Sequence, residues 1–105
     1  YNCVVCVSGA TDYVIEGRKI LKVGNGHPLM TRVTGLGCTA SALCGAFAAV
    51  ENNYCTATAK AMAVMGIVGE IAAQNARGPG SLQLLFLDAL HMLSDADIKK
   101  YLKME

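Results

Sequence analysis

A glycine loop followed at once by a cysteine is the part of this sequence whose residue types and spacing best suit chemistry. In RVTGLGCTASALCGA, residues 32–46, Gly35 and Gly37 flank Leu36, and Cys38 comes next. Glycines allow a backbone to approach a ligand closely, and the first amides of a helix have no internal partner. A helix beginning at Cys38 would therefore offer an anion bare amides and the positive end of its dipole. The same field favours an ionised thiol in the first turn.

Three kinds of site compete with a purely structural explanation of this loop. GLGCTA matches the G-x-G-x-x-A dinucleotide fingerprint, but that motif requires a second parallel strand with an acidic end, and a second helix is expected here. A P-loop is excluded because no Gly-Lys-Ser/Thr is present. A cysteine hydrolase needs a histidine base and an orienting acid, and His27, alone in a turn, is more typical of a structural residue. The structural explanation is that Gly35 and Gly37 only allow close helix packing.

Phosphoryl transfer to a small alcohol is a fourth possibility for the loop. Its catalysis rests mainly on positioning and on stabilising charge, with a base near the attacking hydroxyl group. Amides at residues 36–38 could stabilise the charge on the transferred group, and Cys38 stands where the base belongs. The residues alone leave these alternatives open.

Strand patterns fill the first third of the chain, ahead of the loop. CVVCVS at residues 3–8 is a continuous apolar run typical of a buried strand. TDYVIEG and KILKVG predict a hairpin with a turn at Glu16-Gly17-Arg18. NGHP at residues 25–28 is dense in turn residues, and LMTRV at residues 29–33 predicts a short extended approach to Thr34.

The remaining two thirds predict about four helices. The first, Cys38–Val50, has no polar face wide enough for solvent and should be buried on most sides. The second, Thr56–Ala76, should be stopped by RGPGS, with Gly78 in the C′ position. Two more should follow, one capped by Ser81 and one opened by a capping box at residues 94–97. The core faces of the second and third helices should comprise Met62, Met65, Val68, Gly69 and Ala72, then Leu82, Leu85, Phe86, Ala89, Leu90 and Leu93.

Element order and composition both indicate that this chain does not stand alone. Strands followed only by helices leave one sheet face without helices from the N-terminal side, which suggests the back half of an α/β sheet protein. The 105 residues are 53% hydrophobic and 16% charged, with a mean hydropathy of +0.39. A small monomer has too much surface for so few charges, so the chain should bury faces against other subunits or belong to a larger fold.

Several classes of partner find little support. The net charge of +1 without runs of like charge argues against nucleic-acid binding. The longest uncharged run, Val33–Val50, is rich in small residues and better suits a packed helix than a membrane span. The opening YNCVVCVSGATD, without Met or a basic stretch, predicts no signal peptide and suggests that Tyr1 is not the natural start.

The five cysteines, an odd number spread through apolar segments, indicate a reducing compartment. Cys3 and Cys6 form a CxxC, but on a strand they point to opposite faces about 10 Å apart, too far for a disulfide or a shared zinc. Cys3, Cys6, Cys44 and Cys55 are therefore expected to be buried small hydrophobes.

Isolated charged side chains are expected to be structural. Asp12 and Glu16, in a strand and a turn, should be solvated surface rather than metal ligands. Glu70, a lone acid in MGIVGEIAA, should lie at a helix edge or be paired, with an interface role as the less favoured alternative. His91 should be a partly buried structural residue, and Met62 should pack in the core.

Four motifs together resemble one known family. VTGLGC with the preceding NGHPLMTRV, the upstream VSGATDYV and the downstream ARGPGSLQLLFLDAL are similar to the C-terminal part of hydroxyethylthiazole kinase. That family belongs to the ribokinase-like superfamily and serves thiamine salvage. The resemblance runs from about Val4 to Ile98. It implies an α/β fold in which residues 1–105 form the C-terminal portion of a single ribokinase-like domain.

The resemblance also implies a reaction and a set of site residues. The family passes the γ-phosphate of ATP to the hydroxyl group of 4-methyl-5-(2-hydroxyethyl)thiazole, with Mg²⁺. Cys38 would be the catalytic residue, and the amides of Gly35, Leu36, Gly37 and Cys38 would form the anion hole. Gly35 also falls on a substrate-contacting glycine, and Ser8 falls on a nucleotide-contacting threonine. The family is trimeric, with the thiazole bound between subunits, and we expect a cytoplasmic location for this protein.

This sequence lacks other parts of the family's pattern. The family enzyme is well over twice this length, and its N-terminal half carries a thiazole-contacting methionine, a nucleotide-contacting arginine and the residues that organise Mg²⁺. The resemblance therefore implies a chain that is inactive alone. The alternative is a non-catalytic module derived from such a kinase, which binds anions or nucleotides in an assembly.

Overall fold

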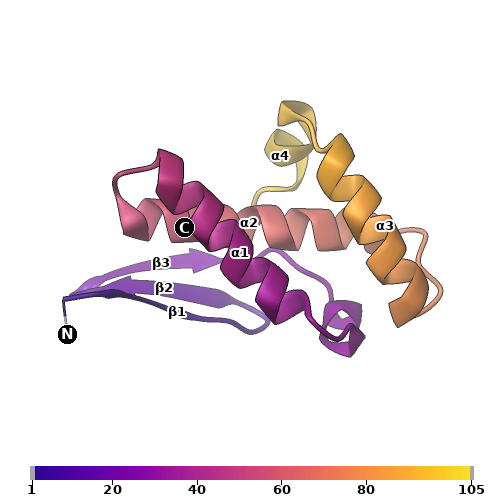
Figure 1. Ribbon diagram of the computed structural model, residues 1–105, viewed down its shortest axis with the longest axis horizontal. Helices are drawn as coiled ribbons and strands as arrows, with labels where there is room; N and C mark the ends of the chain where they lie inside the picture. The colour runs from indigo at the N-terminus through magenta and orange to yellow at the C-terminus, as the bar shows by residue number, and fades with distance from the viewer. Residues whose placement is uncertain (1, 105) are drawn as a thin grey trace.

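The computed structural model describes residues 2–104, which form a three-stranded antiparallel sheet followed by four α-helices (Figure 1). Tyr1, on which one expectation above rests, lies outside these residues. The order confirms the predicted α/β architecture of a few strands followed by about four helices. The elements are β1 (Val4–Val7), β2 (Asp12–Glu16), β3 (Lys19–Val23), the 3₁₀ helix η1 (Pro28–Arg32), α1 (Leu36–Val50), α2 (Tyr54–Ala73), α3 (Pro79–Met92) and α4 (Asp95–Tyr101).

The sheet is a meander with β2 in the centre. β2 pairs with β3 from Asp12↔Val23 to Glu16↔Lys19, which confirms the predicted hairpin. Gly17, in its turn, has a φ of 59°, a conformation that glycine adopts without the strain of a side chain. Val23 also forms an isolated bridge with Met104, so the C-terminal segment returns to the sheet.

One face of the sheet is covered and the other is open. Because side chains alternate along a strand, Val14 and Val23 face α2 and are fully buried in a cluster with Cys55, Ala59 and Ala63. The opposite face carries apolar side chains that remain exposed: Val5, Val7, Tyr13 and Ile20. The high apolar content of the chain is thus partly accounted for by a sheet face without a cover among the described residues.

The long helix α2 organises the other elements. In Figure 1 it runs along the long axis of the molecule, with the sheet beside its first half and α3 at its far end. Val68 and Ala72 pack there against Leu82 and Phe86. The predicted core residues of α2 are buried: Met62, Met65, Val68, Gly69 and Ala72. Within residues 2–104, α2 is long and apolar enough to cross a membrane, but 72% of its apolar window is buried inside the fold, as in a core helix.

Three local predictions about α1 and η1 are wrong. Residues 29–33 are not extended, because Pro28 opens the 3₁₀ helix and the His27 Nδ1 accepts a hydrogen bond from the Leu29 amide at 3.1 Å. The helix expected from Cys38 begins at Leu36. It is also not buried on most sides, since α1 contains no buried residue and only one of its faces lies against α2.

The boundary between α2 and α3 also differs from the prediction. α2 ends at Ala73, and Gln74 rather than Gly78 follows it as the cap. Gly78 is instead the N-cap of α3, with an extended backbone, and Pro79 occupies the first turn, where its missing amide proton costs nothing. Ser81, predicted as the cap, is instead the third residue of the helix, and its hydroxyl oxygen accepts hydrogen bonds from the amides of Arg77 and Gly78 just before it.

Burial of several polar and sulfur side chains was also predicted wrongly. Cys3 and Cys6 are exposed because β1 is an edge strand, while Cys44 is half-buried and only Cys55 is buried as expected. His91 is exposed rather than partly buried.

The capping box at Ser94, with the Asp97 carboxylate accepting from the Ser94 amide, is confirmed.

Gly66 of α2 gives a test of this packing. A Cβ at residue 66 would lie 2.5 Å from the backbone carbon and oxygen of Asn25, and a backbone cannot move aside as a side-chain end can. We expect Gly66→Ala to destabilise the protein by about 1–3 kcal/mol through overpacking. The free energy of unfolding in urea, followed by circular dichroism, measures this change.

Gly45 of α1 is the matched control for that experiment. It also lies within a helix, but a Cβ there meets nothing within 4 Å. Gly45→Ala should therefore stabilise the protein by up to about 1 kcal/mol through helix propensity. Equal effects of the two substitutions would contradict the close approach of the loop to α2.

Candidate functional site

A cavity of about 610 Å³ lies where the ends of several elements meet. Its volume is in the range of small-molecule sites. The walls come from the turn after β1, the loop after β3 with η1, the first turns of α1 and the middle of α2. The polar or bare positions in the wall are Ser8, Gly9, Asp12, Asn25, Gly26, His27, Thr31, Gly37 and Gly66; the apolar ones are Ala10, Pro28, Met30, Leu36, Ala40, Met62 and Met65.

The N-terminus of α1 contributes unpaired amides to this region. Gly35 is the N-cap, with a φ of 91° and no side-chain cap. The first amide of α1 with an intrahelical bond is that of Thr39, which donates to the Gly35 carbonyl oxygen at 3.1 Å. Within residues 2–104, the hydrogen bonds include no partner for the amides of Leu36, Gly37 or Cys38. This end of α1 therefore has the bare donors and the dipole that bind anions.

The two glycines of the loop are not there to allow close packing among the described residues. A Cβ built on Gly35 or on Gly37 meets nothing within 4 Å. Gly35 is required by its positive φ, a conformation that L side chains rarely adopt. Neither reason applies to Gly37, which lies in the cavity wall. A bare backbone at this position is what the approach of a ligand requires.

The structure brings some of the predicted site residues together. Ser8, Leu36 and Gly37 line the same cavity, although Ser8 is 28 positions before Leu36 in the sequence. Gly35 and Cys38 adjoin this wall in the chain, but they are exposed and do not line the cavity. The Cys38 thiol is thus accessible beside the open amides, outside the part of the site that residues 2–104 enclose.

Asp12 is a wall residue that sequence reasoning missed. It was expected on the solvated surface, yet its exposed fraction is 5%. Its Oδ1 accepts a hydrogen bond from the Gly9 amide at 3.1 Å. Burial raises the pKa of the Asp12 carboxyl above its ordinary value, and the bond from Gly9 opposes that rise. The signal in the sequence is alternation, because Asp12 is two residues before Val14, an inward-facing residue of the same strand.

Two thiols, those of Cys6 and Cys44, have raised pKa values. Cys6 is exposed as a residue, but partial burial of its thiol is the main cause that raises its pKa, and the nearby Asp12 and Cys44 add to it. Burial also raises the pKa of Cys44. Because the thiolate is the reactive form, both side chains should remain neutral thiols near pH 7.

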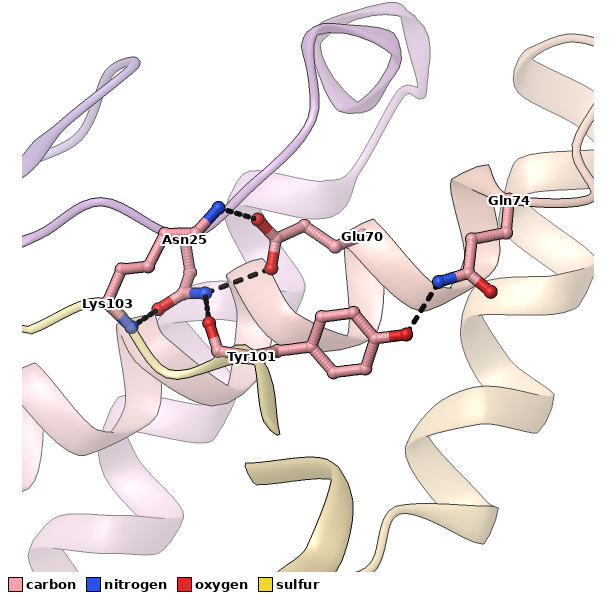
Figure 2. Close-up of polar contacts among 5 residues, drawn as sticks. All are labelled: Asn25, Glu70, Gln74, Tyr101 and Lys103. Carbon is pink, nitrogen blue, oxygen red and sulfur yellow. Dashed lines mark hydrogen bonds and ion pairs between the residues drawn. The ribbon is translucent and has the colours of Figure 1, made fainter. Parts of the chain in front are cut away.

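A hydrogen-bonded network centred on the buried Asn25 holds the cavity's NGHP loop in place (Figure 2). Asn25 is 3% exposed, and its Nδ2 donates to Glu70 Oε2 at 2.9 Å and to the Tyr101 carbonyl oxygen at 2.6 Å. Its Oδ1 accepts from the Lys103 amide at 2.7 Å. The Lys103 Nζ pairs with Glu70 Oε1 at 3.1 Å, and Gln74 donates to the Tyr101 hydroxyl. The prediction that Glu70 is paired is confirmed, and Asn25 joins the C-terminal segment to the loop.

Residues 2–104 contain no group of three or more His, Cys, Asp or Glu side chains that could hold a metal ion. His27, a histidine in the cavity wall, uses its Nδ1 to cap η1. Its hydrogen bonds within the described part of the chain include no carboxylate, so no nucleophile–histidine–acid arrangement is present there. The cavity offers instead hydroxyl groups, bare amides and one buried carboxylate.

Comparison with known proteins shows one family throughout. The model of the hydroxyethylthiazole kinase family matches residues 1–96. A protein of Syntrophus aciditrophicus named hydroxyethylthiazole kinase is 63% identical over 103 residues, covering 98% of this chain. One of the same name from Leptospira biflexa is 56% identical over 99 residues, covering 94% of this chain. The solved structure of a hydroxyethylthiazole kinase protein from Pyrococcus horikoshii covers 99% of this chain with a TM-score of 0.95 and 42% identity.

The same comparisons show that these relatives are much longer. The chain covers 38% of the Syntrophus protein, 37% of the Leptospira protein and 41% of the Pyrococcus chain. The match therefore concerns about two fifths of each relative. The fold prediction made from the resemblance is confirmed over nearly the whole chain.

The Asn25 network predicts a specific loss when its amide is removed. Asn25→Ala would leave Glu70 with one partner fewer and the Lys103 amide without an acceptor. We expect a loss of about 1–3 kcal/mol in the free energy of unfolding and faster hydrogen exchange at the Lys103 amide. Native-state hydrogen exchange measured by mass spectrometry reports both the free energy of unfolding and the exchange rate of the Lys103 amide. Asn52→Ala, at an exposed position, is the control, and unchanged protection of residues 101–104 would contradict the network.

Proposed function

The chain belongs to the hydroxyethylthiazole kinase family, and on this basis we propose that it forms part of an ATP-dependent alcohol kinase. The proposed reaction transfers the γ-phosphate of ATP to the hydroxyl group of 4-methyl-5-(2-hydroxyethyl)thiazole, a step of thiamine salvage. Residues 1–105 are the C-terminal portion of its single domain. The observation that carries the proposal is the uncapped N-terminus of α1, which opens on a cavity of ligand size.

The open amides suit the charge that develops in this reaction. The alcohol oxygen forms a bond to the γ-phosphorus, the bond to the bridging oxygen breaks, and ADP leaves. Charge on the phosphoryl oxygens is stabilised by donors that are already oriented before the reaction. The amides of Leu36, Gly37 and Cys38 are such donors, and Gly37 lets them be approached without a clash.

Cys38 is the proposed catalytic residue. It lies in the first turn of α1, exposed and next to the open amides. In this position its sulfur would accept the proton of the substrate hydroxyl as the oxygen attacks. Ser8 follows directly after β1 in the cavity wall. Its hydroxyl group would donate a hydrogen bond to the nucleotide. Gly35 would contact the thiazole substrate.

Magnesium would neutralise phosphate charge when it is bound with the nucleotide. The donor set of residues 2–104 does not fit a protein-held magnesium site, since these residues provide no group of three carboxylate or imidazole ligands.

The site also requires polypeptide beyond this chain. Cys38 and Gly35 are exposed, and the face of α1 turned away from α2 carries no buried residue. We propose that this face lies at the subunit interface of a cytoplasmic homotrimer, with the thiazole bound between subunits. Residues 1–105 alone should therefore not catalyse the phosphoryl transfer.

Turnover of the longest natural chain that contains these residues tests the proposed function. With ATP, Mg²⁺ and hydroxyethylthiazole, we expect phosphorylated thiazole as the product. Cys38→Ala should lower kcat about 10²-fold or more because a general base is lost, while the Kd for ATP stays within about twofold of wild type. Cys44→Ala, a half-buried thiol on the same helix, is the matched control. Unchanged kcat in Cys38→Ala would refute the assignment of the base. Absence of phosphorylated thiazole would favour the non-catalytic module.

Gly37→Ala tests the anion site separately. Its new Cβ meets no atom of the described structure within 4 Å, so the fold should be unchanged or slightly more stable. The methyl group would stand where the phosphoryl group approaches, and we expect kcat/KM for ATP to fall about tenfold or more. Steady-state kinetics and thermal unfolding together measure this. A normal kcat/KM with a normal melting temperature would show that phosphate does not approach this backbone.

A further inference from the structure

Asp12 is a buried carboxylate that the proposed reaction does not yet use. It is 5% exposed and lies in the cavity wall. The hydrogen bonds and ion pairs of residues 2–104 give it one partner, the Gly9 amide, at 3.1 Å from Oδ1. A carboxylate with so little exposure to solvent is costly unless its remaining lone pairs are satisfied.

The second oxygen of Asp12 is not sealed in the protein. No polar side-chain atom that is inaccessible and unpaired occurs among the described residues. Oδ2, which has no protein partner there, therefore retains access to open space. The open space next to Asp12 is the cavity itself. Asp12 is thus a nearly buried side chain in the cavity wall, and one of its carboxylate oxygens has no partner among the described residues.

The sheet register places Asp12 beside Ser8. The last pair of β1 and β2 is Val7↔Tyr13, and continuing the register by one position sets Ser8 opposite Asp12. Because alternate residues share a face, Asp12 lies on the same side of β2 as Val14, the side covered by α2. One wall of the cavity thus holds a hydroxyl group and a carboxylate, while the N-terminus of α1 forms another wall.

These two walls differ in electrostatic character. The α1 amides attract negative charge, whereas the Asp12 carboxylate repels it. No lysine or arginine lines the cavity, so within residues 2–104 no cationic side chain in the wall compensates the carboxylate. Burial also raises the pKa of the Asp12 carboxyl above its ordinary value. A ligand that satisfies both walls carries its anionic group at α1 and an uncharged hydrogen-bond donor at Asp12.

We propose that Asp12 is a ligand-binding residue whose free carboxylate oxygen accepts a hydrogen bond from an O–H or N–H group of the bound small molecule. This inference rests on the proposed function, which supplies two molecules with such a donor. One is the nucleotide, through its ribose hydroxyls or adenine amino group. The other is the alcohol of the thiazole substrate.

Two substitutions separate ligand binding from support of the turn. Asp12→Asn keeps an oxygen that can accept from the Gly9 amide but replaces the free acceptor with an NH₂ donor. Asp12→Ala removes both. Asp88→Asn, an exposed acid on α3, is the matched control. The variants are made in the longest natural chain, with the Kd of Mg·ATP and of hydroxyethylthiazole measured by calorimetry and the KM of each measured by turnover.

The expected result is that Asp12→Asn weakens binding of one of the two probes about tenfold or more, a loss of about 1.4 kcal/mol. The other probe and the melting temperature should be unchanged. The affected probe identifies the donor as nucleotide or alcohol. Wild-type binding of both probes by Asp12→Asn would overturn the inference, and a defect confined to Asp12→Ala would show that Asp12 only supports the turn.

Failure of the proposed function is recognised separately. If the wild-type protein transfers no phosphate but binds a probe, the kinase assignment fails, and the calorimetric comparison still decides the role of Asp12. If the wild-type protein binds neither probe, the inference is overturned together with the function on which it rests.

Discussion

The contact between the loop after β3 and the helix α2 is the constraint on which the site depends. Gly66 and Gly69 leave α2 bare, so that the backbone of Asn25 and the side chain of Met30 can lie directly on the helix. Glu70, one helical turn after Gly66, fixes the loop by accepting a hydrogen bond from Asn25. Two glycines and one carboxylate on a single helix face therefore set where the NGHP loop and η1 lie, and η1 leads directly into α1.

That placement explains how an open helix end can exist beside a packed core. A helix N-terminus inside a core would leave donors unsatisfied at a cost of about 1–3 kcal/mol each. Here α1 begins at Leu36, after a loop that rests on α2, and its first two residues, Leu36 and Gly37, line the cavity. Gly35 makes the entry possible through its positive φ. The stability of the fold and the availability of the amides thus depend on the same loop.

Features set by local periodicity could be predicted from the sequence, and features set by neighbouring elements could not. The hairpin around Gly17 and the apolar stripe containing Leu82 and Phe86 follow from alternation and from helical spacing, and both are present. Alternation places Asp12 on the same sheet face as Val14, but the burial of that face depends on its being the one that α2 covers, which alternation does not specify. Cys6 was expected to be buried because the apolar sequence of its strand is typical of a central strand. The strand lies at the edge of the sheet, and Cys6 is exposed. The glycine loop before a helix was predictable because glycine spacing is a local feature, whereas the cavity beside it joins residues distant in sequence.

Exposure of Cys38 shows what the proposed chemistry still requires. A base that removes a proton from an alcohol works best where water is excluded and the donor is held in one orientation. The described residues enclose Ser8, Asp12 and Gly37 in one cavity but leave the thiol outside its wall. Catalysis by Cys38 therefore requires a second surface over the α1 N-terminus. The relatives that share this fold have more than twice as much chain from which to build one. The binding half of the proposed site can thus be studied on these residues, whereas the proton-transfer half depends on how that second surface closes over Cys38.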